Sequence, residues 1–398
     1  MKICYFVYRE ENVMVYTSQV LEYLQQLKKK SNVEEVGIIL FRHEKNMFKR
    51  IDVEDKALQY VDWIHSFASL PVLSSVQLRV NALRARKYIT SQFPKEIKMA
   101  VICRGELAAI MASIAFKGYE NVRILFDNRG LPVLESELSH QNKFIYKLNR
   151  KQKKLAICYA KDHCDMYNFV TNAMRTFLIK EYGYKKDLPY TIIPTLYTPS
   201  MFNMDKLEEI KEKENLREDD LVISYVGGTQ SWQSVDLLVQ LIGCIGKKYP
   251  EAKFLLLTNG TLPSLRKLAE SVQERIIKKT VPHCDMPYYL AMTSIGIVIR
   301  DDNMVNRVAA PTKIAEYITN GVSVLYKGNI GVIDDLKKIG TPLNLIPIDN
   351  NCCWLDKIGE VKKVTVSQSV LEYFDMDNRQ NDTLKMIEEA FRRPKIGG

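Results

Sequence analysis

Hydrophobic and polar positions along the chain predict strands and helices in alternation. Short runs with an apolar centre, such as residues 2–8 and 98–105, are typical of strands that are buried on both faces. Residues 18–30 and 106–118 instead carry apolar side chains at the three- and four-residue spacing of amphipathic helices. Strands that are separated by helices of about 10–15 residues indicate parallel sheets with right-handed crossovers.

A strongly charged segment divides this pattern into two halves. Residues 206–220 contain few apolar side chains, so we expect them to form a linker between domains. The alternation fills residues 1–205 and starts again in residues 221–375. We therefore predict an α/β protein with two doubly wound, Rossmann-like domains. Residues 376–398 are predicted to form a C-terminal helix that packs back on the first domain.

The composition of the 398-residue chain is that of a globular protein, with 46% hydrophobic and 26% charged residues. No apolar run approaches the roughly 18 residues of a membrane helix, and the first apolar stretch is too short for a signal peptide. We therefore expect a cytoplasmic protein. The eight cysteines and five histidines show no metal-ligand spacing, so we expect reduced thiols, no cofactor and no bound metal.

The net charge of +10 is concentrated in one part of the chain. Residues 75–190 contain 21 Lys and Arg against 10 Asp and Glu, which indicates an anionic partner for this region. Nucleic acid is not the expected partner, because no motif of a known nucleic-acid-binding module is present. Five basic residues recur at helical spacing and form one stripe: Lys143, Lys147, Arg150, Lys151 and Lys154. This stripe is either a solvated helix face or a contact with an anionic membrane surface, which would make the protein peripheral on the inner membrane face.

Residues that suit a ligand follow the strands of the second half. Gly227 and Gly228 end one strand, where backbone without side chains can approach a ligand closely. Arg300 ends another strand, and arginine is well suited to binding phosphate in a bidentate way. Because ligands of parallel sheets bind beyond the carboxyl ends of the strands, these residues are candidates for one site. On its own, a glycine pair could equally form a tight turn without binding a ligand. An arginine at a strand end could equally have a structural role.

A short helix that opens at Pro311 supplies three further candidates. Thr312 lies at its start, where free backbone N–H groups and the helix dipole favour an anion. Lys313 adds a positive charge, and Glu316 lies on the same helix face, where its carboxylate could accept hydrogen bonds from the two hydroxyls of a sugar. The alternative is a solvated Lys–Glu pair worth a few tenths of a kcal/mol.

The order of these candidate residues along the second half of the chain resembles that in the retaining nucleotide-sugar glycosyltransferases of family 4, which have the GT-B fold. The resemblance is carried by "YVGGTQSWQSVDLLVQLI", "MPYYLAMTSIGIVIR" and "APTKIAEYITNGVSVLYKGNIG", with "FDNRG" and "IIPTLYTPSMF" in the first half. It implies that the two domains face each other across a cleft and that the donor is a UDP or GDP sugar. It also implies that Glu316 binds the donor ribose, while Arg300, Thr312 and Lys313 hold the diphosphate.

The chain departs from that family at three positions. Gly228 and Gln233 stand where many members have an arginine and a lysine, and Val308 stands where they have a glutamate. The missing phosphate charges lead us to expect Arg300 and Arg307 as substitutes. The missing glutamate leaves the contacts to the transferred sugar open.

The first half supplies the candidates for the acceptor side. Arg104, Asp127 and Arg129 follow strands and resemble segments that line the cleft in the family, so they are our catalytic candidates. Either arginine could instead simply pair with Asp127. The acceptor implied by the resemblance is the hydroxyl of a glycan, and a basic membrane-facing helix would suit one linked to polyprenyl diphosphate.

One motif raises the question of a metal. Asp375 and Asp377 form a D-x-D sequence, which binds manganese in the other large glycosyltransferase fold. Here it precedes a helical pattern, so Asp375 is better explained as a helix N-cap. We expect cationic side chains and helix N-termini to neutralise the leaving diphosphate in place of a metal.

The resemblance therefore implies a hexosyltransferase that acts with retention and without a metal, and it suggests bacterial surface polysaccharide as the product. Two alternatives remain open. A sugar-nucleotide 2-epimerase of the same fold would need carboxylates for proton transfer, and no convincing set is present. A catalytically silent nucleotide-sugar-binding partner of a glycan synthase is compatible with the missing charges.

Overall fold

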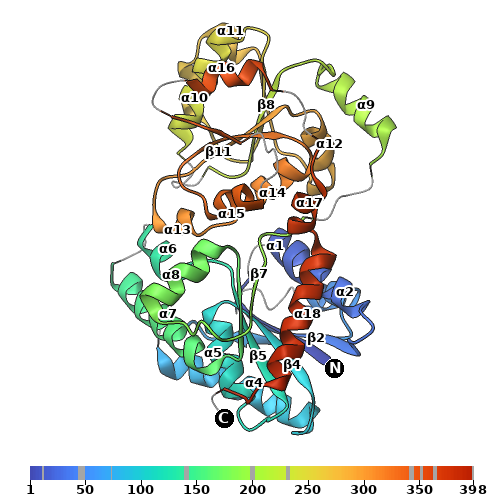
Figure 1. Cartoon of the computed structure of the whole chain (residues 1–398), viewed down its shortest axis with the longest axis vertical. Coiled ribbons are helices and arrows are strands. Elements are labelled where there is room, and N and C mark those ends of the chain that lie inside the picture. The colour runs from blue at the N-terminus through green and yellow to red at the C-terminus, as the bar shows by residue number, and fades with distance from the viewer. Residues whose placement is uncertain are drawn as a thin grey trace. The chain divides into compact units, whose positions relative to one another are not determined.

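The computed structural model describes residues 1–10, 13–43, 50–72, 74–138, 143–197, 202–229, 234–339, 345–349, 353–361 and 365–396. The chain forms two compact units, shown in Figure 1. The first unit contains Met1–Pro194 together with Met376–Gly398, and the second contains Thr195–Asp375. The last segment of the chain thus belongs to the first unit.

The first unit is built on a parallel sheet of seven strands in the order β3-β2-β1-β4-β5-β6-β7. The strands are β1 (Lys2–Tyr8), β2 (Glu35–His43), β3 (Trp63–Ser69), β4 (Met99–Arg104), β5 (Val122–Asn128), β6 (Met166–Phe169) and β7 (Tyr190–Ile192). The predicted alternation of strands and helices is confirmed, but the sequence pattern missed β3 and the helix before it. The polar residues of β3 at the sheet edge obscure its apolar pattern, since only three of its seven residues are buried.

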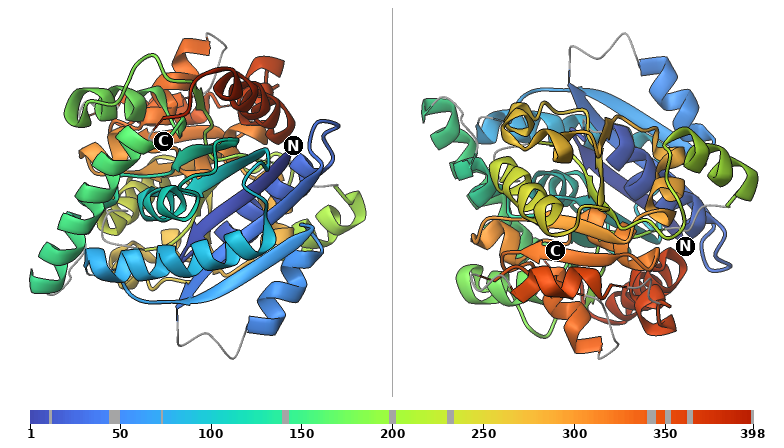
Figure 2. Two further views of the ribbon diagram at one scale, coloured as in Figure 1. Left: turned by 90° about the horizontal axis from the view of Figure 1, so that it is seen from below. Right: turned by 90° about the horizontal axis from the view of Figure 1, so that it is seen from above.

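Helices cover both faces of this sheet (Figure 2). On one face α4 (Ser75–Gln92) packs against α5 (Glu106–Ala115), which in turn packs against α7 (Lys143–His163). The other helices that precede the last one are α1 (Val13–Tyr16) with its π-helical continuation (Thr17–Leu21), α2 (Glu22–Lys28), α3 (Arg50–Leu58), α6 (Pro132–Leu138) and α8 (Asn172–Tyr182).

The C-terminal helix α18 (Met376–Arg392) packs against α2 and against β5, β6 and β7 of the first unit. The buried guanidinium of Arg123 holds the C-terminal end of α18. It donates hydrogen bonds to the carbonyls of Ala390 and Arg393, each at 3.0 Å. Further along the helix, the buried amide of Gln380 donates to the carbonyl of Tyr23 at 2.7 Å. These bonds satisfy polar groups that would otherwise be buried without partners.

The second unit contains a parallel sheet of six strands in the order β10-β9-β8-β11-β12-β13. The strands are β8 (Val222–Val226), β9 (Lys253–Leu257), β10 (Ile276–Lys279), β11 (Ile295–Ile299), β12 (Ser323–Lys327) and β13 (Leu345–Pro347). Its α-helices are α9 (Met204–Lys213), α10 (Val235–Lys248), α11 (Glu270–Gln273), α12 (Met286–Ala291), α13 (Met304–Arg307), α14 (Thr312–Thr319), α15 (Gly331–Ile339), α16 (Cys353–Gly359) and α17 (Gln368–Phe374). Two 3₁₀ turns, Pro263–Lys267 and His283–Asp285, complete it.

The expected linker at residues 206–220 is instead part of the second unit. Helix α9 occupies most of it, and Leu207 and Ile210 are buried in the core of that unit. The two residues are three apart and therefore share one helix face, which a composition dominated by charge concealed. The chain passes from one unit to the other after Pro194 and again after Asp375.

We predict that Arg123→Met will destabilise the first unit by about 2–3 kcal/mol, because it removes charged hydrogen bonds to carbonyls that stay buried. Urea unfolding followed by circular dichroism measures the change. Arg392→Met is the matched control, since this arginine on α18 is exposed. Equal loss of stability in the two variants would show that Arg123 does not fix the helix.

Candidate functional site

The second sheet has a topological switch point between β8 and β11. The chain runs outward from β8 through β9 to β10 and then returns to lay β11, β12 and β13 on the other side of β8. At such a point the loops diverge and leave room for a ligand beyond the carboxyl ends of the strands. Gly227, Arg300 and Gly328 directly follow the neighbouring strands β8, β11 and β12.

Two glycines, Gly227 and Gly228, form the part of this site that follows β8. Gly227 has a φ of 129°, which only glycine adopts readily, and its N–H donates to the carbonyl of Leu257 at 3.1 Å. The hydroxyl of Tyr225 donates to the carbonyl of Gly228 at 2.6 Å and holds the turn closed. The turn therefore leaves backbone without side chains at the end of β8, as the proposed approach of a ligand requires.

Arg300 is held at the end of β11 by its backbone, which donates to the carbonyl of Lys327 at 3.1 Å. Gly328 makes room for it, because a Cβ at that position would lie 2.4 Å from the carbonyl oxygen of Arg300. The Nη1 atom of Arg300 lies 3.5 Å from the amide oxygen of Asn306. Its Nε atom is buried without a hydrogen-bond partner among the described residues. A buried donor that is left unsatisfied favours a ligand that can accept from it.

Lys313 lies in the first turn of α14, and its side chain is 7% exposed. Its ammonium lies 4.5 Å from the centre of the Tyr225 ring. Burial, followed by the charge of Arg300, lowers the pKa of Lys313 to about 7, while Glu316 acts in the opposite direction. Burial also lowers the pKa of Arg300. Two cationic side chains are thus concentrated in one poorly solvated place, where an anion would stabilise the charged form of both.

Glu316 follows one turn later on the same helix and is half-buried. Around it, the amide of Asn320 donates to the Glu316 carbonyl at 2.7 Å and to the hydroxyl of Tyr197 at 3.0 Å. Thr312, at the start of the helix, is exposed. The structure therefore brings together Gly227, Gly228, Arg300, Thr312, Lys313 and Glu316 around one end of the second sheet.

Arg307 does not fit the role we expected for it. Its Nε and Nη2 atoms donate to both carboxylate oxygens of Asp302, at 2.7 and 2.8 Å, so its charge is already neutralised. Both side chains are about half exposed. Val308 is buried and presents no polar group. Gln233 lies outside the described residues.

In the first unit, the catalytic candidates form a hydrogen-bonded cluster at the carboxyl ends of β4 and β5. Asp127 accepts from the hydroxyl of Tyr5 and from Nε of Arg129, each at 2.9 Å, and from the amide of Asn168. Arg104 donates through Nε to Glu10 at 3.0 Å, while its Nη1 lies 4.0 Å from Asp127.

This arrangement assigns different tasks to the three candidates. Asp127 is 1% exposed and surrounded by donors, so its carboxylate fixes the arginines and cannot reach a substrate. The cavity next to it holds about 10 Å³, enough for about one water molecule and too small for a sugar. Arg104 and Arg129 are partly exposed at the strand ends and remain the two members that a ligand can contact.

The basic stripe lies on α7 and is exposed along most of its length. Lys147, Lys151 and Lys154 are exposed, while Arg150 is paired with Glu137 at 2.9 Å. The side chain of Lys143 lies outside the described residues. No helix in the described part of the chain is long and apolar enough to cross a membrane.

Three polar residues near these sites had not been singled out from the sequence. Tyr225 places its ring beside Lys313, and Asn306 is a buried amide next to Arg300. Glu106 opens α5 just beyond β4, and burial raises the pKa of its carboxyl to about 7. A tyrosine within a buried strand and an asparagine in a short helix are both common, so neither gave a signal without the three-dimensional contacts.

The D-x-D motif divides between two helices. Asp375 is the C-cap residue of α17 and immediately precedes α18, while Asp377 lies in the first turn of α18 and pairs with Lys30. Among the described residues, no cluster of three or more His, Cys, Asp or Glu side chains could hold a metal. The seven cysteines within the described ranges are free thiols.

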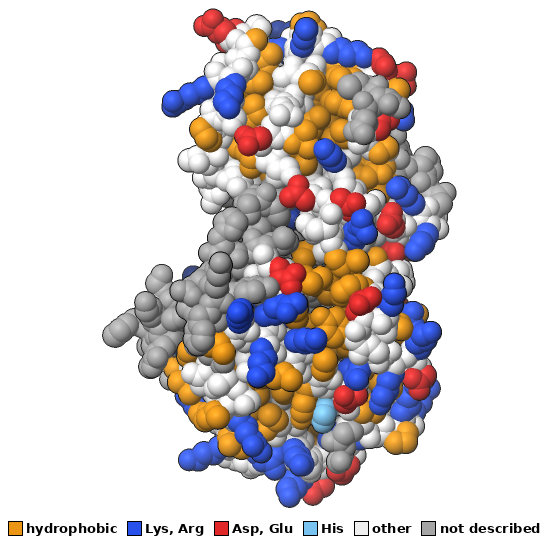
Figure 3. Space-filling model, turned by 90° about the vertical axis from the view of Figure 1, so that its left-hand side faces the viewer, with side chains coloured by type: hydrophobic (Ala, Val, Ile, Leu, Met, Phe, Trp, Pro, Cys, Tyr) orange, Lys and Arg blue, Asp and Glu red, His pale blue; other side chains and the backbone are white. Residues whose placement is uncertain are grey.

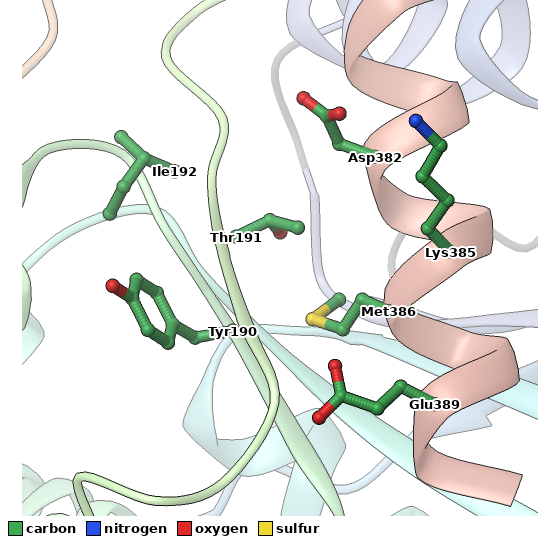
Figure 4. A pocket seen from close by; sticks show the side chains of 7 residues that line it. All are labelled: Tyr190, Thr191, Ile192, Asp382, Lys385, Met386 and Glu389. Atoms are coloured by element: carbon green, nitrogen blue, oxygen red, sulfur yellow. The ribbon is translucent and has the colours of Figure 1, made fainter.

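A groove of about 450 Å³ in the first unit lies between β7 and α18 (Figure 4). Of the β7 side chains, only Thr191 points toward the helix. The carboxylates of Asp382 and Glu389 are already paired with Arg379 and Arg393. The groove therefore lacks the convergent free polar groups of a specific ligand site.

Solved structures with a similar fold cover nearly the whole chain. A glycosyltransferase from Rickettsia africae shares 15% identity over 98% of this chain and 99% of its own, with a TM-score of 0.67. HepE from Anabaena, in complex with UDP and glucose, shares 12% identity over 97% and 99%, with a TM-score of 0.61. WaaG, a glycosyltransferase of lipopolysaccharide biosynthesis, shares 11% identity over the full length of both chains, with a TM-score of 0.55.

These similarities confirm the predicted fold, two Rossmann-like units of the GT-B type. No protein-family model and no curated protein sequence matches the chain. At identities this low, similarity to solved structures establishes the fold, while the chemistry of the site has to be argued from its residues.

We predict that anion binding at this site takes up a proton, because Lys313 is only partly charged near pH 7 in the free protein. A bound diphosphate raises the pKa of Lys313, so affinity should be constant below about pH 6 and fall up to tenfold per unit above about pH 7. Isothermal titration with a nucleoside diphosphate sugar, whose phosphates do not titrate near neutrality, should show uptake approaching one proton at pH 8.5. Two buffers of different ionisation enthalpy measure the uptake.

Lys313→Met is the control for this linkage. It should bind more weakly at every pH and take up no proton. Constant wild-type affinity between pH 6 and 9 would exclude Lys313 from the binding site.

Proposed function

We propose that the protein is a glycosyltransferase that moves a hexosyl group from a nucleoside diphosphate sugar to a glycan hydroxyl with retention of configuration. The observation that carries the proposal is a pair of cations at the switch point of the second sheet, the buried Lys313 and the partly buried Arg300. A diphosphate carries the negative charge that two neighbouring cations attract. Glu316 lies one turn further along α14, and we assign its carboxylate the role of accepting hydrogen bonds from the ribose hydroxyls.

The same cations would also support the chemical step. When the bond between the sugar and the diphosphate breaks, negative charge builds up on the leaving phosphate oxygens. Positive groups that are already fixed in a poorly solvated site stabilise that charge at little reorganisation cost. Arg300 and Lys313, together with the N–H groups at the start of α14, fill this role with the protein's own groups and without a metal.

The donor and acceptor classes follow from different observations. HepE was solved with UDP and glucose, and this supports a UDP sugar as the donor here. On the acceptor side, Arg104 and Arg129 are the partly exposed groups of the first unit, and we assign them contacts with the acceptor. The lysine stripe of α7 suits an acceptor presented at an anionic membrane, such as a glycan linked to polyprenyl diphosphate in surface polysaccharide synthesis.

A second candidate function is a nucleotide-sugar-binding partner without activity of its own. The observation in its favour is Val308, which is buried and apolar where the resembled family has a glutamate that contacts the sugar. This candidate predicts tight donor binding without turnover.

Donor screening followed by a hydrolysis assay separates the two functions. The true donor among UDP, GDP, CDP and ADP sugars should raise the melting temperature most, because a ligand stabilises the state to which it binds. With that donor, a transferase should release free sugar slowly without acceptor and should do so equally in EDTA. Binding without any release over a day would favour the silent partner, and release that needs added manganese would contradict a metal-independent site.

A matched pair of arginine variants tests the phosphate site. Arg300→Met should weaken donor binding by about 1.5–3 kcal/mol, because a buried charged donor is lost. Arg307→Met should change it by less than about 0.5 kcal/mol, because this guanidinium already pairs with Asp302 at the surface. Titration calorimetry measures both. Equal losses in the two variants would mean that the diphosphate lies closer to α13 than we propose.

A further inference from the structure

The strand β7 is a free edge of the first sheet. It comes last in the strand order, and no strand of the described residues pairs with its outer side. The carbonyl of Pro189 and the N–H of Ile193 both bond to the backbone of β6, at 3.0 and 2.8 Å. Because successive residues of a strand direct their backbone groups to opposite sides, the N–H and C=O groups of Tyr190 and Ile192 point to the free edge.

The groove between β7 and α18 lies beside these backbone groups (Figure 4). Its volume is about 450 Å³, and its other wall is one face of α18. Neighbouring strands of a sheet lie about 4.8 Å apart, so a strand added to β7 would lie next to this helix face. A free strand edge can bind an extended peptide in this way, with affinity from main-chain hydrogen bonds and specificity from the side chains around it.

The groove carries an excess of positive charge. The carboxylates of Asp382 and Glu389 are paired with nearby arginines, so they add no net charge. Lys385 is exposed in the lining and forms no ion pair with a described residue. Beyond β7, the guanidinium of Arg175 lies 3.9 Å from the centre of the Tyr190 ring, which is 43% exposed. Lys385 and Arg175 thus flank the groove as two cations that no described carboxylate neutralises.

The surroundings of the groove are basic as well. Lys185 and Lys186 are exposed in the loop that leads into β7, where Asp187 is the acidic residue beside them. On the face of the first unit drawn in Figure 3, blue Lys and Arg side chains are more frequent than red Asp and Glu side chains. The field of such a surface attracts an acidic partner and repels a basic one.

We propose that the free edge of β7 binds an extended acidic segment of a partner protein, which adds a strand to the first sheet. The backbone groups of Tyr190 and Ile192 hold the segment, and Lys385 and Arg175 select its charge. A small ligand fits the groove poorly because the lining side chains offer few free polar groups, whereas a peptide pairs with the backbone. This contact is independent of the sugar transfer proposed above.

A second copy of this chain fits the edge less well. Two β7 strands paired across a two-fold axis would bring the same cations together, and like charges opposite one another are destabilising. With three residues, β7 would also gain few hydrogen bonds from such a pair. Short strands and lysines are features by which proteins protect a sheet edge from self-association. Self-pairing is therefore an outcome of the test.

A random peptide library tests the proposal on the full chain. Octapeptides displayed on phage are selected on the wild type and, in parallel, on Ile192→Pro. Proline at this position removes the N–H that points to the free edge and keeps the bonds to β6, so the fold should persist. The wild type should enrich peptides with acidic and β-branched residues at alternate positions, and Ile192→Pro should enrich none of them.

Fluorescence anisotropy then measures the affinity of the most enriched peptide. Ile192→Pro and Lys385→Glu should each weaken binding at least tenfold. Their matched controls, Ile192→Val and Lys385→Arg, keep the N–H and the charge and should bind as the wild type. A peptide whose acidic residues are exchanged for lysine should bind Lys385→Glu better than it binds the wild type.

Hydrogen exchange followed by mass spectrometry locates the bound peptide. The amides of Tyr190 and Ile192 should exchange more slowly with peptide present. Binding of the nucleotide sugar should be unchanged in all four variants, which separates a failure of this contact from a failure of the proposed function. If Ile192→Pro misfolds, peptides methylated at alternate backbone nitrogens replace it, since methylation removes the donors of the peptide itself.

Three results would overturn the proposal: no enrichment beyond that on Ile192→Pro, enrichment of peptides without acidic residues, or slowed exchange elsewhere than in β7. A doubled mass of the wild type in analytical ultracentrifugation, which Ile192→Pro abolishes, would assign the edge to a second copy instead.

Discussion

The candidate site of the second unit depends on two positive side chains that lie close together, the buried Lys313 and the partly buried Arg300. Removing a charge from water is costly unless a partner compensates, and bringing like charges together adds to the cost. At the switch point between β8 and β11 the protein accepts this cost at Arg300 and Lys313. Gly328, Asn306 and Tyr225 each serve to hold one of the two in place. A bound anion would lower the free-energy cost of holding these two cations together.

The charged groups at the carboxyl ends of the strands are arranged differently in the first unit. There, two arginines face two carboxylates, so the cluster around Asp127 is balanced within itself. A balanced cluster fixes geometry and contributes little net attraction for charged ligands. This contrast supports the proposed function, in which the second unit binds a charged donor and the first unit positions a neutral hydroxyl.

Local patterning was enough to predict the two sheets and most of their helices, because strands buried on both faces leave long apolar runs. The same logic placed Arg300 after a strand and Lys313 and Glu316 on a short helix, where the structure has them. Spacing could not reveal that Lys313 is buried, since a Lys–Glu pair three apart looks the same at a surface. Nor could it reveal that Arg307 is bound to Asp302, or that Leu207 and Ile210 anchor a charged helix in a core. Those facts depend on contacts between segments that only the folded chain brings together.

The return of α18 to the first unit has a consequence for how the protein is made. Residues 1–194 leave the ribosome well before residues 376–392, so the strands β5, β6 and β7 lack their covering helix α18 until that later segment is translated. At roughly 5–20 residues per second, the intervening residues take on the order of ten seconds or more to be added. During that interval the nascent first unit exposes apolar sheet surface of the kind that chaperones bind. Truncated products of incomplete translation would therefore be recognised as unfinished even though most of the first sheet had already been synthesised.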